Sequence, residues 1–496
     1  MKSREANQAR QSRRTISTTT DAFSIGTPMR YATIIIMLAT ATPVAAQVTT
    51  PPTLGPAPTL TIPPVQRTTL PNGLTIIVAR NAEVPVVDAR LIVDGGARLN
   101  AAAGMATFAA SMLSEGAGGR DALNLAEEIA FLGASIGAGA SWENFAVSLR
   151  APRRTIDPAM ALMADMVFRP NFASADVKRV RDLRLASFLQ ARDQPGAVAQ
   201  RVFSRTVFPA GHPLHLSITG DSASTVIVDS AAVRTFWNRS IDPRRATLVL
   251  TGDVTLADGR AWATRHFGRW KAPAAVLSKP AARAVSAAPT MSTRIILVDK
   301  PGAAQSVIMI GAPGVSRTSP DYAAITLMNA IMGGSFSSRL NDFLREQLGY
   351  SYGANSSYQW SPVAGPFVAS SQVRTNVTDS SLVVFFREFK RMRDEPVTDV
   401  ELTRGKNYLV LGALSDYETA GDISGAISTS LLFGQPMDQI TRDLKAINAL
   451  TTAQVQAAAR RHLDPSKLTI VVVGDIANIR AGIEKLGLGP VEVQTY

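Results

Sequence analysis

Cysteine is absent from all 496 residues, which excludes disulfide bonds, thiolate zinc sites, iron–sulfur clusters and cysteine nucleophiles. Histidine is scarce as well: there are only four, so a metal site would be short of imidazole ligands. The sequence contains no uninterrupted run of about 18 apolar residues, which excludes a protein with several membrane-spanning helices. Charged residues make up only 18% but hydrophobic residues make up 46%, so the chain can bury substantial cores and is not intrinsically disordered.

A basic stripe with interleaved aromatic residues is also missing. The formal net charge is +12, of which residues 1–50 contribute +4 from six basic and two acidic side chains. The remaining excess is spread along the chain and is balanced locally by acidic neighbours. Nucleic-acid-binding proteins concentrate positive charge on one face. We therefore expect a solvated basic surface and no nucleic-acid partner.

Residues 29–47 have the pattern of a secretory signal peptide: a short basic start, a mostly apolar run of about ten residues, and small residues before a cleavage point. An uncleaved anchor and a twin-arginine signal at Arg13-Arg14 are the alternatives, but the run is short for spanning a bilayer. We expect cleavage between Ala46 and Gln47. The mature protein is then periplasmic and has no stable membrane insertion.

The segment before the first domain is proline-rich. Residues 47–66 contain six prolines and almost no charge, which is typical of an extended tether. We expect residues 1–46 to be an N-terminal extension with the signal peptide, and either Met1 or Met29 to be the start of translation.

An internal repeat organises the rest of the chain. Residues 233–254 align without a gap with residues 455–476, and both segments predict a helix that ends near Asp-Pro, a buried strand and a Gly-Asp turn. The starts of the two halves also correspond, because residues 74–93 and 294–310 each predict two strands, which we expect to be paired. A repeated order of elements indicates a duplication.

The fold class that follows is α+β, with two homologous domains that are each a mainly antiparallel sheet covered by helices. We expect the first domain at residues 67–271 and the second at residues 292–496. Residues 272–291, rich in alanine and proline, are the expected linker.

The segment Gly104–Gly116, Gly-Met-Ala-Thr-Phe-Ala-Ala-Ser-Met-Leu-Ser-Glu-Gly, resembles the zinc-site helix of the pitrilysin/insulinase-type metallopeptidases, in particular their small bacterial and mitochondrial-processing-peptidase-like branch. In that family two histidines and a glutamate occupy the positions of Thr107, Ser111 and Ala110. The resemblance places Ala186 or Ser187 at the third ligand, a glutamate. Histidines one helical turn apart hold the zinc and the glutamate takes a proton from its water, whereas Thr, Ser and Ala do neither.

We therefore expect no metal and no other cofactor in this chain. A substitute site at His212 and His215 is the alternative, but a proline separates the two and no third ligand is evident. The resemblance also accounts for Gly211-His212-Pro213 as an ordinary loop of the family.

The second half resembles the same family over residues 331–353, which contain Gly-Gly-x-x-Ser-Ser-Arg-Leu and Leu-Arg-Glu-x-x-Gly-x-x-Tyr. The resemblance implies that Arg345 grips the substrate and that the Tyr352 hydroxyl stabilises an oxyanion. From the residues alone, Arg345 could be a helix-end cation paired with Glu346 or Asp342, and Tyr352 could be a half-buried packing residue. Tyr350 lies outside the seven-residue spacing and is expected to pack.

The segment before this pair is the expected substrate-binding loop, formed by Gly333, Gly334, Ser335 and Phe336. The two glycines allow either a helix end or a close approach of substrate backbone.

The resemblance implies a non-zinc subunit of an exported heterodimeric peptidase. A homologous partner subunit is expected to bring the zinc, and this chain, without independent activity, to bring Arg345 and Tyr352 to a bound peptide or unfolded protein. The alternatives are a non-catalytic peptide-binding or scaffolding protein of the cell envelope, and a self-sufficient peptidase with an unrecognised site.

Overall fold

The computed structural model describes residues 60–99, 102–277, 292–362 and 364–495. The expected signal peptide, most of the proline-rich tether and most of the linker at 272–291 lie outside the described residues. The first strand begins at Val65, two residues before the expected start of the first domain. Within the part of the chain that the structure describes, no helix is both long and apolar enough to cross a bilayer.

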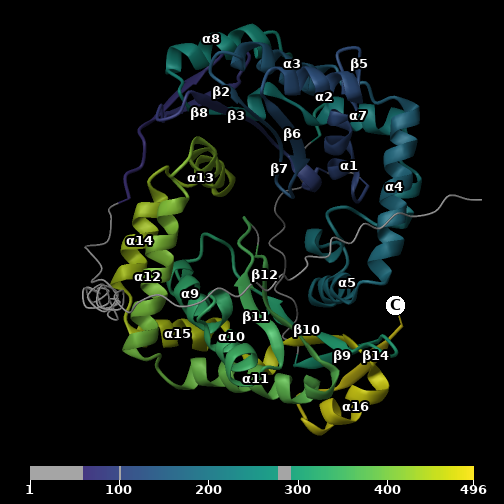
Figure 1. Cartoon of the computed structure of the whole chain (residues 1–496), viewed down its shortest axis with the longest axis vertical. Helices are drawn as coiled ribbons and strands as arrows, with labels where there is room; N and C mark the ends of the chain where they lie inside the picture. The colour runs from purple at the N-terminus through teal and green to yellow at the C-terminus, as the bar shows by residue number, and fades with distance from the viewer. Residues whose placement is uncertain (1–59, 100–101, 278–291, 363, 496) are drawn as a thin grey trace, which may run out of the picture. The chain divides into compact units, whose positions relative to one another are not determined.

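The first half is built on a six-stranded sheet (Figure 1). Its strands in spatial order are β1 (Val65–Thr69), β2 (Thr75–Arg80), β8 (Ala246–Gly252), β3 (Val86–Asp94), β7 (Asn144–Pro152) and β6 (Ser135–Ala140). All neighbours are antiparallel except β2 and β8. A separate two-stranded ribbon is formed by β4 (Gly116–Ala117) and β5 (Arg120–Asp121).

The second half repeats this sheet. The spatial order is β14 (Val491–Gln494), β9 (Arg294–Asp299), β13 (Thr469–Gly474), β10 (Gln305–Pro313), β12 (Pro366–Arg374) and β11 (Ser351–Tyr358). Only β14–β9 and β9–β13 are parallel pairs. The α+β class and the duplication predicted from the sequence are confirmed.

The two opening strands of each half are not paired with one another, contrary to the expectation from the sequence. The strand that closes the half lies between them, β8 between β2 and β3, and β13 between β9 and β10. It runs parallel to the first strand and antiparallel to the second, and so satisfies the backbone groups of both.

The Asp-Pro element of the repeat has the same geometry in both halves. The carboxylate of Asp242 accepts a hydrogen bond from the backbone N–H of Arg244, 3.0 Å away, and the carboxylate of Asp464 accepts one from Ser466, also at 3.0 Å. Each carboxylate caps a short 3₁₀ turn that leads directly into the central closing strand. The repeat read from the sequence is therefore a strand-entry motif.

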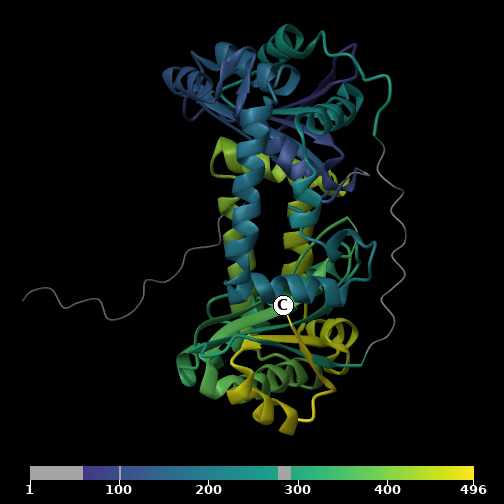
Figure 2. The same cartoon turned by 90° about the vertical axis from the view of Figure 1, so that its right-hand side faces the viewer.

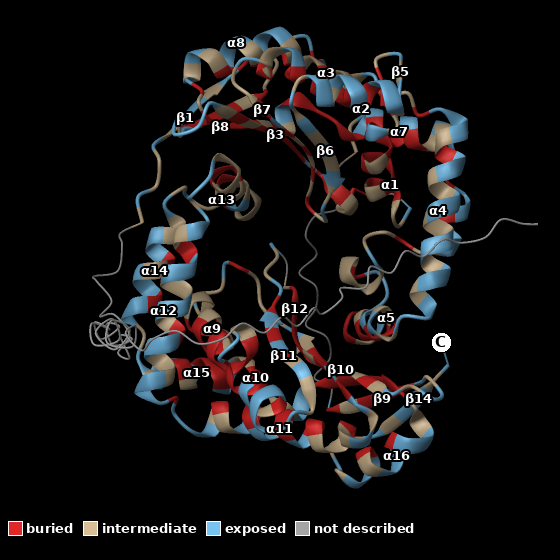
Figure 3. Ribbon diagram, in the orientation of Figure 1, coloured by how far each residue is buried: buried red, intermediate tan, exposed pale blue. Residues whose placement is uncertain are grey.

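The helices of the first half are α1 (Met105–Ser111), α2 (Ala122–Phe131), α3 (Ile156–Phe168), α4 (Ser174–Arg192), α5 (Pro195–Val207), α6 (Ser222–Val226), α7 (Ser230–Ser240) and α8 (Leu256–Phe267). Those of the second half are α9 (Tyr322–Asn329), α10 (Arg339–Asn341), α11 (Thr378–Asp394), α12 (Asp399–Ser415), α13 (Ala420–Phe433), α14 (Gln439–Ala449), α15 (Thr452–His462) and α16 (Ile476–Lys485). Most of them cover one face of the sheet in their own half, where the buried side chains gather (Figure 3).

The opposite face of each sheet is covered by a helix from the other half (Figures 1 and 2). Helix α5 packs Val202 and Phe203 against β9, β10 and β13, while α13 packs Ile423 and Ile427 against β2, β3 and β8. The Thr251 hydroxyl on β8 also donates to the carbonyl of Ala420, 2.7 Å away. The reciprocal exchange explains why the described residues of both halves form one compact unit.

Candidate functional site

Helix α1 begins where a loop of the same half presses against it. Gly104 has a φ of 82°, and a Cβ on it would lie 2.3 Å from the carbonyl oxygen of Thr219. Only glycine fits this position, because both the left-handed backbone and the close approach exclude a side chain. The loop 217–220 therefore lies directly beside the first turn of α1.

The three residues at the family's zinc-motif positions offer no metal ligand. The Thr107 hydroxyl lies 3.0 Å from the carbonyl of Gly104 and 3.3 Å from that of Ile218, and the Ser111 hydroxyl donates to Phe108, 2.8 Å away. Ala110 is buried and only 1% exposed. Both hydroxyls donate to backbone carbonyls, and a neutral hydroxyl is a poor zinc ligand compared with the imidazoles of the family's motif.

A cation from α4 occupies the space beside these residues. Nη1 of Arg184 donates to the carbonyl of Gly104 at 3.1 Å and to Oγ1 of Thr107 at 3.3 Å. The guanidinium also lies over the ring of Phe108, 4.9 Å from its centroid. The sequence interpretation did not single out Arg184. The sequence did contain a signal that Arg184 lacks an ion-pair partner on its own helix, because no acidic residue stands three or four positions before or after it.

The third-ligand position has been lost as well. Ala186 and Ser187 are exposed on α4, and the Ser187 hydroxyl donates to the carbonyl of Arg184, 2.7 Å away. Across the described ranges, no group of three or more His, Asp and Glu side chains could hold a metal ion. The residues present do not fit the zinc ion of the family's motif, and the positive charge of Arg184 lies beside Thr107, one of the lost ligand positions.

His212 and His215 serve the loop that contains them. Nδ1 of His212 accepts a hydrogen bond from the backbone of Leu214 at 3.0 Å, and the ring stacks on Phe208 with centroids 4.4 Å apart. Burial, then His215 and then Arg98 lower the pKa of His212. Nδ1 of His215 lies 2.8 Å from the carbonyl of Phe208. These contacts hold the loop together and bring no third ligand near.

The predicted pair of the second half lies at a distortion of the sheet edge. Tyr352 is the second residue of β11, at a β-bulge between Ser351 and Ala354, and it is 91% exposed. The Ser351 hydroxyl accepts from the backbone N–H of Gly353 at 2.9 Å, and Ser371 of β12 donates to it at 2.8 Å. A bulge turns a side chain away from the regular alternation, so it presents Tyr352 to solvent.

Arg345 lies on the π-helical turn Asp342–Gln347 that precedes this strand. Its guanidinium stacks over the ring of Phe336, 4.7 Å from the centroid, and Nε lies 3.2 Å from a carboxylate oxygen of Glu346. The contact with Glu346 agrees with the interpretation of Arg345 as a helix-end cation paired with a neighbouring carboxylate. This ion pair is solvent-exposed and therefore weak. Tyr350 is partly buried against the core of the second half.

The predicted substrate-binding loop divides into two parts. Gly333 approaches β11, because a Cβ on it would lie 2.6 Å from Ser356, and Gly334 approaches Asn329. The Ser335 hydroxyl donates to the carbonyl of Ala330 at 3.0 Å. Phe336 is 66% exposed beneath Arg345. The structure brings Phe336 and Arg345 together, whereas both glycines pack against the protein itself; the substrate-binding role of the loop stays a prediction.

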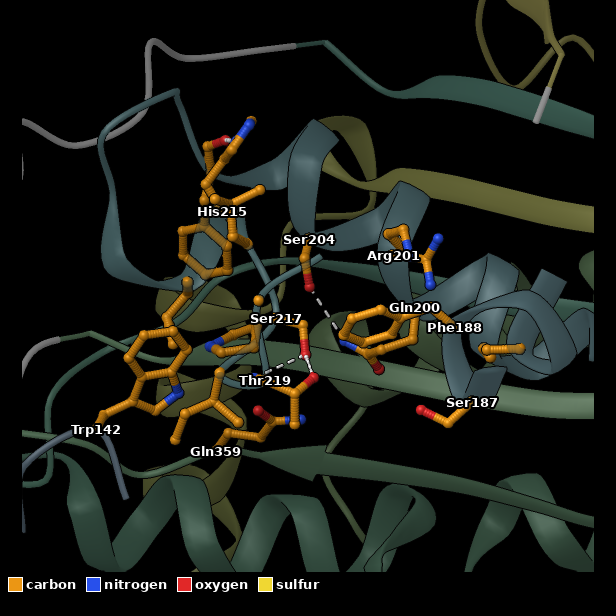
Figure 4. A pocket seen from close by; sticks show the side chains of 18 residues that line it. Trp142, Ser187, Phe188, Gln200, Arg201, Ser204, His215, Ser217, Thr219 and Gln359 are labelled. Carbon is orange, nitrogen blue, oxygen red and sulfur yellow. Dashed lines mark hydrogen bonds between the residues drawn. The ribbon is translucent and has the colours of Figure 1, made fainter. Parts of the chain in front are cut away.

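A cavity of about 470 Å³ lies beside the altered zinc-motif helix (Figure 4). Its lining comes from α4, α5, the loop 214–220 and the turn between β11 and β12. Trp142, from the turn between β6 and β7, also lines it. Apolar and neutral polar side chains such as Phe188, Gln200 and Gln359 dominate the lining, and Arg201 adds a charged one. Both halves of the chain contribute to its wall.

A duplicated α+β fold with a degenerate metal-site helix defines a metallopeptidase-like protein whose own first half lacks the metal ligands. The sequence pattern of insulinase (peptidase family M16) matches residues 75–220, and that of the peptidase M16 inactive domain matches residues 228–409. The chain therefore belongs to peptidase family M16.

Individual relatives agree with this assignment. An uncharacterized zinc protease of Streptomyces coelicolor is 25% identical over 84% of this chain and 91% of its own length. A non-peptidase homolog of Helicobacter pylori is 20% identical over 81% of this chain and 91% of its own length. The crystal structure of a peptidase M16 inactive domain from Pseudomonas fluorescens superimposes with a TM-score of 0.76 at 27% identity, covering 83% of this chain and 98% of that chain.

Proposed function

We propose that this chain is the non-zinc subunit of a heterodimeric M16 peptidase and supplies Tyr352 and Arg345 to an active site completed by a homologous subunit. The observation that carries the proposal is the contrast between the two halves. In the described residues of the first half no side chains form a metal site, whereas the second half holds an exposed tyrosine on a hydrogen-bonded bulge and an exposed arginine seated on Phe336.

The chemistry of the pair fits a role in peptide hydrolysis. A phenol that stands free of its own protein can donate a hydrogen bond to the oxyanion that develops when a peptide bond is attacked. The guanidinium carries a positive charge at all relevant pH values and can bind a backbone carbonyl or a carboxylate of the same peptide. The partner contributes the metal site, and this chain has no peptidase activity alone.

The test is kinetic and uses a mixture of the two subunits. The partner is the homologous exported subunit of the same organism that retains both histidines and the glutamate at the positions of Thr107, Ser111 and Ala110. Tyr352→Phe should lower kcat on an unstructured peptide by roughly 10²-fold, since one preorganised donor is lost, with little change in KM.

The matched control is Tyr350→Phe, which removes the same hydroxyl two residues away from a side chain packed on the core, and its kcat should stay within about twofold. Gel filtration establishes that each variant still forms the heterodimer. Full kcat in a Tyr352→Phe heterodimer contradicts the shared active site.

The second candidate is a peptide-binding or scaffolding protein without a catalytic role. The cavity beside α4 supports it, because its lining of aromatic and neutral polar groups could hold a peptide without any chemistry. The two candidates differ in whether an M16 partner is needed. Peptide hydrolysis that appears only on mixing the two subunits favours the heterodimer.

We place either activity in the periplasm, on the strength of the signal-peptide pattern at residues 29–47. N-terminal sequencing of the protein recovered from cells should begin at or near Gln47. A chain that retains Met1 or Met29 in the soluble cytoplasmic fraction contradicts export.

A further inference from the structure

Arg184 is a half-buried cation whose charge is not compensated within the described residues. Burial alone lowers the pKa of its guanidinium, and no neighbouring carboxylate acts in the opposite direction. An arginine remains protonated at neutral pH even when partly buried. A buried charge is costly unless a partner offsets it, so an unpaired one indicates a place for an anion.

The geometry of Arg184 leaves part of its guanidinium available. Its hydrogen bonds to Gly104 and Thr107 both use Nη1. Nε and Nη2 have no partner among the described residues and are not enclosed. These two nitrogens form the edge of the guanidinium that can bind both oxygens of one carboxylate. The stacking on Phe108 and the two bonds to α1 restrict the orientation of that edge.

Arg184 does not itself line the cavity of Figure 4, but two of the lining residues lie close to it. Ile218, whose carbonyl lies 3.3 Å from the Thr107 hydroxyl, lines the cavity, and so does Ser187, which lies one helical turn after Arg184. Among the described residues, no aspartate or glutamate lines it and Arg201 does, so no carboxylate of the described lining repels an anion. Trp142 and Phe188 provide apolar surface, and Gln200 and Gln359 provide groups that can hydrogen-bond to a peptide backbone.

We propose that Arg184 and this cavity form a binding site for a carboxylate carried by a peptide. Arg184 thus gives the degenerate site a binding role in place of a metal-dependent one. The carboxylate is either the C-terminus of the peptide or an acidic side chain within it. That the carrier is a peptide rests on the proposed function; that the group is a carboxylate rests on Arg184 itself.

The first experiment compares peptides on the wild-type chain without any partner subunit. The probes are dye-labelled decapeptides of Ala, Ser, Gln and Leu, followed by fluorescence anisotropy: one with a free C-terminal carboxylate, one with a C-terminal amide, and one amidated with a single internal Asp. At least one carboxylate-bearing peptide should bind roughly 10- to 100-fold more tightly than the neutral one. Preference for the first identifies the C-terminus as the source, and preference for the third identifies an acidic side chain. Equal affinity for all three overturns the proposal.

The second experiment uses Arg184→Met, which keeps the length of the side chain and removes its charge. The preference for the carboxylate peptide should disappear, and Arg184→Lys should retain part of it. The matched control is Arg192→Met, which removes an exposed charge from the same helix and should leave the preference intact. Thermal melting establishes that each variant is folded. A preference that survives in Arg184→Met overturns the proposal, and the wild-type peptide comparison decides the matter if that variant does not fold.

These measurements fail independently of the proposed function. The binding assay contains no partner subunit, so a missing heterodimer does not affect it. Conversely, Tyr352→Phe tests the shared active site without involving Arg184.

Discussion

Arg339 and Glu401 form a two-point ion pair that ties the segment carrying Phe336 and Arg345 to the start of α12. Nε of Arg339 lies 2.6 Å from Oε1 of Glu401, and Nη2 lies 2.9 Å from Oε2. The same carboxylate accepts a hydrogen bond from the backbone N–H of Thr398 at 2.9 Å, completing the capping box of α12. One carboxylate therefore holds two elements of the second half in register.

This pair predicts a loss of stability in acid. Burial raises the pKa of Glu401, but the hydrogen bonds from Arg339 and Thr398 outweigh burial and hold the pKa at about 2. A carboxyl whose pKa is lower in the folded state contributes its full stability above its unfolded pKa of 4.5, and loses it as the pH falls towards about 2. Glu401→Gln should lower the free energy of unfolding at pH 7 by about 3 kcal/mol, and this difference from wild type should shrink below pH 4.

Urea denaturation at pH 7 and in steps down to pH 3 measures this effect. Glu484→Gln is the control, because Glu484 pairs with Arg480 on the exposed surface of α16, and it should change stability by less than about 0.5 kcal/mol. A Glu401→Gln variant as stable as wild type at pH 7 contradicts the role given to the pair.

The first half predicts a dependence of metal binding on Arg184. The wild-type chain should carry no stoichiometric zinc after dialysis. Restoring the family's ligand set by Thr107→His, Ala110→Glu, Ser111→His and Ser187→Glu should give only weak zinc binding while Arg184 is present. The guanidinium of Arg184 would repel the zinc ion, since two unit positive charges about 4 Å apart repel by about 4 kcal/mol at an intermediate dielectric constant.

Adding Arg184→Ala to the restored variant should raise its zinc affinity at least tenfold, as measured by competition with a chromophoric chelator. Arg192→Ala in the same background is the control for overall charge. One tightly bound zinc per wild-type chain, found by elemental analysis, would show that the ligand assignment is wrong.

Arg345 predicts a kinetic effect different from that of Tyr352. It contacts Phe336 and Glu346 without being buried, so its loss should not disturb the fold. In the reconstituted heterodimer, Arg345→Ala should raise KM by roughly tenfold, because it removes a charged contact to bound substrate. Arg442→Ala removes an exposed arginine from α14 of the same half and should leave KM unchanged. An unchanged KM for Arg345→Ala leaves Arg345 without a binding role.

The exchange of helices between the halves predicts that a substitution in the first half destabilises the second. Phe203 of α5 is completely buried against the second sheet, and a Cβ on Gly311 of β10 would lie 2.8 Å from its ring. Phe203→Ala should lower the free energy of unfolding by about 3–5 kcal/mol. Val226→Ala, at a position 55% exposed, is the control and should be nearly neutral. A cost below about 1 kcal/mol would mean that α5 does not hold the second sheet.

The prediction of duplication succeeded because its signals were local. Asp242-Pro243 and Asp464-Pro465 each cap a turn with their own carboxylate, and the apolar runs that follow become the buried strands β8 and β13. The lost ligands at Thr107 and Ser111 could be read through the resemblance of Gly104–Gly116 to the family's zinc-site helix, in which two histidines stand at a fixed spacing.

The pairing of the opening strands was predicted incorrectly for a physical reason. Residues 74–93 show two strands close in sequence, but the insertion of β8 between them involves a segment more than 150 residues further on. Hydrogen bonding between strands depends on which partner completes the ladder, and the sequence near a strand does not identify that partner.

By itself, the sequence determined the repeated α+β architecture, because the repeat is expressed in residue type and short spacing. Its resemblance to a known family indicated the loss of the zinc ligands and made Arg345 and Tyr352 candidates. Only the tertiary structure decided that α5 and α13 cover the sheets of the opposite halves, that Tyr352 lies on an exposed bulge, and that Arg184 stands uncompensated beside Thr107. Those properties depend on contacts between segments far apart in the chain, and burial and charge compensation exist only once those segments have packed.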